Sequence, residues 1–254
     1  MTTVRSDDRD GGVRVLTLDR PPANAIAEDL LADLIAAVDA AREDDGVRAV
    51  VLTGAGRFFC AGRDLGAVPR ERAGVRELNR LYRDAHEKLL SLPKPTVAMM
   101  NGHAVAGGLI LVLACDYRLG VAGDYRVGVN EVAIGASYPL VAFEIARLRL
   151  SHQRAAELML GAALYPASEA LRLGIVDELF PAETFEATVL RRAARLGGYP
   201  REVYAHTKAQ LIGEAVARVR AETDDEAERV ALLWQLEESR AARRRQQEKL
   251  GLRK

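Results

Sequence analysis

The sequence predicts an α/β fold in which strands alternate with helices in the first half and helices dominate the second half. Two observations indicate this fold class: short β-rich runs end at prolines or glycines, and the segments between them carry the apolar period of a helix. With 254 residues, 49% hydrophobic and 28% charged, the chain is long enough to bury one substantial core.

The expected strands are Val13–Leu18, Ala49–Thr53, Thr96–Met100, Asp116–Val121 and Tyr125–Val129. Each is short and rich in β-branched or other apolar residues. Pro21-Pro22 follows the first strand and Gly54-Ala55-Gly56 follows the second, and residues of these types end strands. We find no internal repeat in the sequence, so the alternation indicates a layered core rather than a repeat array.

The expected helices are Glu28–Arg42, Glu77–Leu92 and Gly107–Cys115, and beyond Pro139 almost the whole chain has a helical pattern. In the first helix, Leu30, Leu34 and Val38 share one face. The apolar face of the second comprises Leu78, Leu81, Tyr82, Ala85 and Leu89. The segment Gly66–Gly74 has glycine, proline and charge but no period, which predicts a mobile surface loop.

Two turns of small residues lie at Phe59–Leu65 and Asn101–Leu111. In the second, Gly107-Gly108 lies where a strand gives way to an apolar helix, and the first N–H groups of a helix have no partner within it. Such N–H groups can hold a negative charge, either fixed or developing in a reaction. Each turn alone is most simply a tight turn, but one N–H from each can form an oxyanion hole.

The composition argues against several partners. Lys+Arg and Asp+Glu each number 36, so no net field attracts nucleic acid or acidic membrane. Cys60 and Cys115 are too few for a disulfide framework, and the four histidines have no metal-ligand spacing. The acidic start is unlike a signal peptide, and the longest apolar stretch, Leu109–Cys115, is too short to span a bilayer. We therefore expect a cytoplasmic protein without a bound metal.

Taken together and in order, the motifs resemble the crotonase superfamily, the enoyl-CoA hydratases and isomerases. The resemblance covers about residues 10–215 and rests on Pro21–Ala25, Phe59-Cys60-Ala61-Gly62-x-Asp64-Leu65, Lys94-Pro95, Asn101-Gly102-x-Ala104-x-x-Gly107-Gly108, Ala114-Cys115-Asp116, Ala167–Ala170 and Gly174–Asp177. It implies a spiral of ββα units in residues 1–195 and a C-terminal helical trimerisation region in residues 196–254. It also implies an acyl-CoA thioester as substrate, no separate cofactor, and a homotrimer or hexamer.

The resemblance assigns roles to individual residues. The backbone N–H groups of Arg63 and Gly107 are implied as the oxyanion donors, with the Arg63 side chain pointing elsewhere. Glu131, in Val129-Asn130-Glu131-Val132, is implied as the catalytic carboxylate, and Asp64 as the residue that holds the turn. The residues expected to contact substrate are Ala23, Ala61, Asp64, Leu65, Gly108, Ile110 and Tyr138.

Ile110 discriminates among the reactions of the family. Hydratases of this family carry a glutamate three residues after the oxyanion glycine, where this chain has Ile110, which cannot move a proton. Adding water needs two acid/base groups, whereas moving a double bond from C3 to C2 needs only one, Glu131. The segments around Gly107, Asp116 and Glu131 look like those of mitochondrial-type 3,2-enoyl-CoA isomerases. Dienoyl-CoA isomerases would need an acid eight residues after Glu131, where Pro139 stands.

Other functions stay open at this stage. A hydratase on the same fold would need its second acid from Gly66–Gly74, where Glu71 is the only candidate. Another crotonase-fold lyase or hydrolase, or an acyl-CoA-binding paralogue with little turnover, also fits the motifs. Residues 240–254 contain seven basic residues and one acidic residue. This run is most simply a solvated helix end, and the alternatives are contact with coenzyme A phosphates or a nucleic-acid arm.

Overall fold

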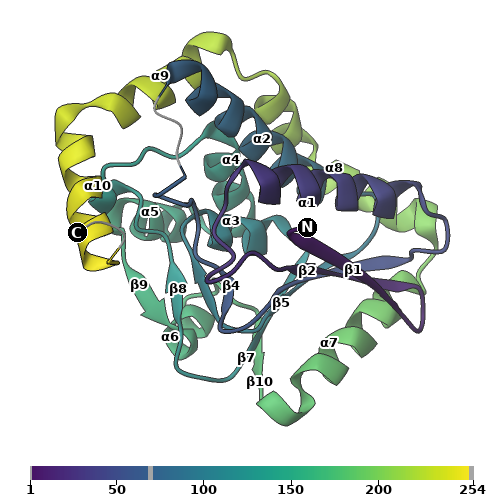
Figure 1. The fold of residues 1–254 in the computed structure, drawn as a ribbon. Helices are drawn as coiled ribbons and strands as arrows, with labels where there is room; N and C mark the ends of the chain where they lie inside the picture. Colours follow the sequence, from purple (N-terminus) through teal and green to yellow (C-terminus); the bar gives the residue numbers. More distant parts are fainter. Residues whose placement is uncertain (1, 68–70, 252–254) are drawn as a thin grey trace.

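Two sheets form the centre of the protein, in a computed structural model that describes residues 2–67 and 71–251 (Figure 1). The larger sheet has the strand order β1 (Val4–Arg9), β2 (Val13–Leu18), β3 (Ala49–Gly54), β5 (Thr96–Met100), β7 (Tyr117–Val121), β10 (Glu178–Phe180). The smaller sheet has the order β4 (Phe58–Cys60), β6 (His103–Val105), β8 (Arg126–Gly128), β9 (Leu164–Pro166). The β1–β2 and β8–β9 pairs are antiparallel, and the other described pairs are parallel.

The chain visits the two sheets in turn and then forms a helix. It runs from β3 to β4 and α2 (Arg72–Leu90), then from β5 to β6 and α3 (Gly107–Ala114), then from β7 to β8 and, after a short turn, α4 (Leu140–Arg149). This is the predicted spiral of ββα units. Because β4, β6 and β8 are parallel neighbours, the residues that follow them lie at one edge of the smaller sheet. That edge therefore carries both small-residue turns and the segment that contains Glu131.

Helices cover the larger sheet on both faces. On one face lie α1 (Glu28–Glu43) and α2, and α7 (Ala182–Gly197) covers the other, as Figure 1 shows. On the α7 side, Phe185 and Val189 pack against apolar side chains from β2, β3, β5 and β7. Since both faces are covered, every residue of β3 and β5 is buried. Every residue of α3 is buried too, which explains why its sequence is apolar all round.

The C-terminal helices fold back onto the same chain. The remaining helices are η1 (Val132–Ile134), α5 (His152–Gly161), α6 (Ala167–Arg172), α8 (Arg201–Arg220), α9 (Asp224–Gln235) and α10 (Glu237–Lys249). Helix α9 packs on α2, and α10 packs on η1 (Figure 1). The contact with α10 is close: Gly135, at the end of η1, has a φ of +68°, and a Cβ there would lie 2.5 Å from Ser239 Cα. Helix α10 thus lies against the turn that follows Glu131.

The expected strands and helices are confirmed, with two corrections. The second predicted helix begins earlier, at Arg72, so the end of the predicted Gly66–Gly74 loop is helical, and residues 68–70 of that loop lie outside the described residues. The chain beyond Pro139 also contains β9 and β10. Like β4 and β6, these strands have only three residues, too few to show a period. The division after residue 195, a position within α7, and the trimerisation role of the region beyond it both stay predictions.

No helix within residues 2–67 and 71–251 has both the length and the apolar composition needed to cross a membrane. The cytoplasmic location stays a prediction.

A buried carboxylate ties α8 to the larger sheet. Asp116, which precedes β7, accepts hydrogen bonds from Lys208 Nζ (2.8 Å) and from Tyr204 Oη (3.1 Å), both on α8. It also accepts from the Thr96 N–H (3.0 Å) at the start of β5. The side chains of Lys208 and Asp116 are only 6% and 11% exposed, so the pair is shielded from water.

We expect Lys208→Met to lower the free energy of unfolding by about 3 kcal/mol, because a buried carboxylate would lose the nearer of its two cations. The other, Arg149, lies with its Nη2 3.3 Å from Asp116 Oδ1. Tyr204→Phe removes a neutral donor to the same carboxylate and should cost only about 1 kcal/mol. Urea unfolding of both variants measures the difference. Equal losses in the two variants would show that the charge of Lys208 is not what holds α8.

Candidate active site

The first small-residue turn is held by the segment that follows β2. The Ala61 N–H donates to Ala23 O (3.0 Å), the Ile26 N–H to Gly62 O (2.8 Å), and the Asp64 N–H to Ile26 O (2.8 Å). In this parallel pairing the N–H of Arg63 points away from Ile26. It makes no hydrogen bond within the described part of the chain. The turn therefore presents one free backbone donor.

The second turn lies directly against the first. Gly62 has a φ of +78°, and a Cβ there would lie 2.5 Å from Ala106 Cβ and 3.2 Å from Gly107 N, so only glycine fits. Gly107 is the first residue of α3, and among the described residues its N–H has no acceptor either. Ala106, which precedes it, has a positive φ of 53°, an uncommon conformation for a residue with a side chain. The two N–H groups expected in the oxyanion hole are thus neighbours and unpaired.

Close packing surrounds the start of α3. A Cβ on Gly107 would lie 3.0 Å from Ile26 Cδ1 and from Tyr82 Cε2, and a Cβ on Gly108 would lie 2.3 Å from Cys60 O. Tyr82, on α2, is buried and stacks on His86 with 3.9 Å between the ring centroids. Gly107 therefore faces Tyr82, while Gly108, predicted to contact substrate, packs on β4.

Glu131 lies at the same edge of the sheet, at the start of η1. Its Oε2 is buried and has no hydrogen-bond partner within the described residues. Burial raises the pKa of this carboxyl from 4.5 to about 7, although nearby backbone N–H groups and the Arg63 guanidinium lower it in part. A carboxyl with a pKa near 7 can both accept and return a proton at neutral pH. Glu131 is therefore not an exposed charge at the end of a strand.

The Arg63 side chain, expected to point elsewhere than its backbone N–H, runs from the first turn to α2. The guanidinium turns into the interior, where its Nη2 donates to Asn79 Oδ1 (2.8 Å). It lies over the rings of Tyr82 (5.8 Å to the centroid) and Trp234 (5.2 Å). Burial lowers the pKa of Arg63, while Tyr82 and Glu131 act to raise it, so the guanidinium is within the electrostatic reach of the carboxyl.

Two residues of the C-terminal helices complete the site, and sequence reasoning missed both. Trp234, at the end of α9, is covered by Arg63 and by the guanidinium of Arg243 on α10, 3.9 Å from the ring centroid. Arg243 Nη1 donates to Gly135 O (2.7 Å), which fixes α10 on the turn after Glu131. Trp234 is the only tryptophan in the sequence, but it lies about one hundred residues from Glu131, so no local pattern connects them.

The basic C-terminal run is therefore only partly a solvated helix end. Arg243 is buried, and Arg244 Nη2 donates to Glu237 Oε1 (2.6 Å). Gln247 Nε2 donates to Leu65 O (2.7 Å) and so ties α10 to the first turn. Residues 252–254 of the run lie outside the described residues. This helix face packs on the candidate site of its own chain.

The other predicted site residues take structural positions around the two turns. Asp64 Oδ2 accepts from Arg20 Nη1 (2.8 Å) and Oδ1 accepts from the Gly66 N–H (2.9 Å), as expected of a residue that holds the turn. Ile110 is fully buried in α3. Tyr138 is buried near Glu131, and its hydroxyl donates to Met159 O (3.0 Å). Ala23 and Ala61 are joined by the backbone bond described above, and both are partly buried.

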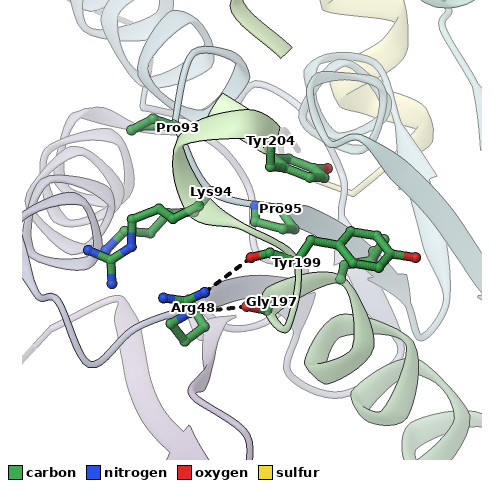
Figure 2. A pocket seen from close by; sticks show the side chains of 9 residues that line it. Arg48, Pro93, Lys94, Pro95, Gly197, Tyr199 and Tyr204 are labelled. Carbon is green, nitrogen blue, oxygen red and sulfur yellow. Dashed lines mark hydrogen bonds between the residues drawn. The ribbon is translucent and has the colours of Figure 1, made fainter. Parts of the chain in front are cut away.

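Two cavities lie away from the two turns and Glu131. Figure 2 shows the smaller, about 10 Å³, beside Arg48 and Lys94 at the far end of β5, with room for one water. There Lys94 Nζ donates to Ala41 O (2.6 Å) and Asp44 O (2.7 Å), so it caps the carbonyl end of α1. A larger cavity of about 420 Å³ lies between α2 and α9, and neither Gly107 nor Glu131 lines it.

Comparison with known proteins places the chain in a family. The model of the enoyl-CoA hydratase/isomerase family matches residues 8–250. A probable enoyl-CoA hydratase, echA17, of Mycobacterium avium is 35% identical over 213 residues, covering 81% of this chain and 80% of the relative. The human mitochondrial enoyl-CoA delta isomerase 1 is 29% identical over 224 residues, covering 85% of this chain and 73% of the relative.

Solved structures agree with this assignment. The human mitochondrial delta3-delta2-enoyl-CoA isomerase superposes with a TM-score of 0.94 at 25% identity, over 98% of both chains. An enoyl-CoA hydratase, EchA3, of Mycobacterium ulcerans superposes with a TM-score of 0.82 at 28% identity, over 91% of this chain and 99% of the other. The chain therefore belongs to the enoyl-CoA hydratase/isomerase family, within the crotonase superfamily, and is an enzyme of that family.

Proposed function

We propose that the enzyme is an isomerase that converts a 3-enoyl-CoA to the conjugated 2-enoyl-CoA, with Glu131 as the single acid/base. The observation that carries this proposal is a carboxyl with a pKa raised to about 7, whose buried Oε2 has no hydrogen-bond partner among the described residues. It lies at the same sheet edge as two backbone N–H groups that have no acceptor in the described part of the chain. Ile110, where hydratases of the family carry a second glutamate, is aliphatic and fully buried.

In this reaction the thioester oxygen accepts hydrogen bonds from the N–H groups of Arg63 and Gly107. Glu131 takes a proton from C2 of the acyl chain, and the negative charge moves to the thioester oxygen, where the two donors stabilise the enolate. The protonated Glu131 then returns the proton at C4, so the double bond shifts from C3 to C2 with no atom gained or lost. The substrate is itself the coenzyme A thioester, and the shift consumes no redox cofactor.

The missing second acid/base group is what makes hydration the weaker proposal. Loss of one general acid/base costs about 10²–10⁴ in rate, or roughly 3–5 kcal/mol in the barrier. Glu71, the candidate replacement, is an exposed residue that precedes α2. The superposition with the human mitochondrial isomerase extends over 98% of both chains and supports isomerisation, while the relatives named as hydratases keep hydration as the second candidate.

A homotrimer or hexamer is also part of the proposal. Exposed apolar side chains support it, such as Leu160 on α5 and Val203 and Leu211 on α8. Side chains of this kind are candidates for contact with further copies of the chain.

Two thioesters separate the candidate functions. We expect measurable conversion of 3-hexenoyl-CoA to 2-hexenoyl-CoA and weak or absent hydration of crotonyl-CoA, followed by the absorbance of the conjugated product and by chromatography. Efficient hydration of crotonyl-CoA would overturn the isomerase proposal. Binding of both thioesters without turnover of either would instead indicate an acyl-CoA-binding paralogue.

A pH profile tests the role of Glu131. Because only the carboxylate can take the proton, kcat/KM should fall about tenfold per pH unit below 7 and level off above it, following the raised pKa of about 7. Glu131→Gln should lower kcat by about 10²-fold or more and leave binding of a saturated acyl-CoA nearly unchanged. A profile that follows a pKa near 4.5, or near-normal turnover in the variant, would rule out this role.

Gly107→Val tests the oxyanion hole. A side chain there would crowd Ile26 and Tyr82 and the space in front of the N–H, so we expect kcat to fall by about 10²–10³. Thermal unfolding reports the cost of packing separately. A variant that keeps its turnover would contradict the assignment of the Gly107 N–H as a donor.

A further inference from the structure

The Arg63 guanidinium is poorly satisfied for a buried charge. A guanidinium carries five N–H donors, and within the described residues only one hydrogen bond is formed, to Asn79 Oδ1 (2.8 Å). No nitrogen of Arg63 is among the buried, unpartnered side-chain atoms of the described chain. The rings of Tyr82 and Trp234 border the space beside the guanidinium and offer few acceptors there.

The charges around this space do not balance. Two guanidinium groups, those of Arg63 and Arg243, lie over the ring of Trp234. Like-charge repulsion from Arg63 and other arginines adds to burial in lowering the pKa of Arg243 to about 10. The carboxyl that faces Arg63 is Glu131, whose pKa of about 7 leaves it partly protonated at neutral pH. An anion that entered this space would find an excess of positive charge.

An ion pair with Glu131 does not account for the position of the Arg63 guanidinium. A carboxylate held in an ion pair with arginine has a lowered pKa, whereas burial dominates at Glu131 and raises its pKa. Glu131 Oε2 accepts no hydrogen bond from Arg63 or from any other described residue. The guanidinium is held in place by Asn79 and the two rings instead, which leaves its free donors for a ligand.

The position of Arg63 along the chain indicates which part of a substrate its side chain meets. Its backbone N–H is the proposed donor to the thioester oxygen, and its side chain runs from there towards Asn79 on α2. The guanidinium thus lies several bonds from the thioester, on the side of the site that Tyr82 and Trp234 enclose. That is where the far end of a short acyl chain would reach.

We propose that Arg63 selects acyl groups that end in a carboxylate, so that the substrates are CoA monothioesters of short unsaturated dicarboxylic acids. This inference rests on the proposed function and names its substrate class. A terminal carboxylate accepts two parallel N–H bonds from a guanidinium, and the rings of Tyr82 and Trp234 hold the guanidinium at a fixed place. The remote carboxylate takes no part in the shift of the double bond.

Matched substrates test the proposal. 3-Hexenedioyl-CoA, its terminal methyl ester and 3-hexenoyl-CoA share the reacting carbons, and only the first carries the charge. We expect kcat/KM for 3-hexenedioyl-CoA to exceed those for the other two by about 10- to 100-fold, as a charged hydrogen bond provides. Arg63→Met should abolish this ratio, and Asn79→Ala, which frees the guanidinium, should reduce it. Arg76→Met removes an exposed arginine of α2 and should leave the ratio unchanged.

Binding of saturated thioesters, which cannot react, tests the proposed substrate class separately from the proposed isomerase reaction. Calorimetry should show that hexanedioyl-CoA binds the wild-type protein more tightly than hexanoyl-CoA does, and that Arg63→Met removes the difference. Turnover of 3-hexenoyl-CoA or the methyl ester at least as fast as that of 3-hexenedioyl-CoA, with no binding preference, would overturn this inference and leave the isomerase intact. A binding preference without isomerisation of any substrate would support the substrate class and overturn the reaction.

Discussion

The candidate site depends on the close approach of two backbone turns. Gly62 lies so near Ala106 and Gly107 that a Cβ would not fit between them, and Gly108 lies equally close to the carbonyl of Cys60. Asn24 holds the backbone next to the first turn. Its buried side-chain amide donates to Ala55 O (3.0 Å) and to Phe58 O (2.8 Å) in β4. With the turns this close, two backbone N–H groups remain that have no acceptor within residues 2–67 and 71–251.

Burial shifts the pKa values of the charged side chains around these donors. Burial raises the pKa of Glu131 to about 7 and lowers that of Arg63, so the carboxyl is closer to neutral than it would be at the surface. A base of this kind suits removal of a weakly acidic proton, and stabilisation of the resulting enolate is what the backbone donors would provide. Since the fold serves hydratases and isomerases alike, we propose that the side chain at position 110, here Ile110, makes the difference between the two reactions.

The C-terminal helices are part of this environment. Gly135 allows α10 to approach the turn after Glu131, Arg243 bonds that turn, and Gln247 bonds the turn that contains Arg63. Trp234 then closes the space above the guanidinium. The agreement with the human mitochondrial isomerase over nearly the full length of both chains includes these helices.

The sequence by itself determined the fold class, the family and the two turns. Its strands and long helices have local periods, and the glycines at 62, 107 and 108 stand in motifs that a linear pattern can show. The three-residue strands β4, β6, β9 and β10 and the charged edge strand β1 have no such period, so the sequence does not predict them. Only the tertiary structure decided that Arg63 turns inward, that Trp234 and Arg243 join it, and that Glu131 Oε2 is buried with no hydrogen-bond partner in the described chain. These properties depend on contacts between residues far apart in the chain and on the exclusion of water, and neither is written in any local pattern.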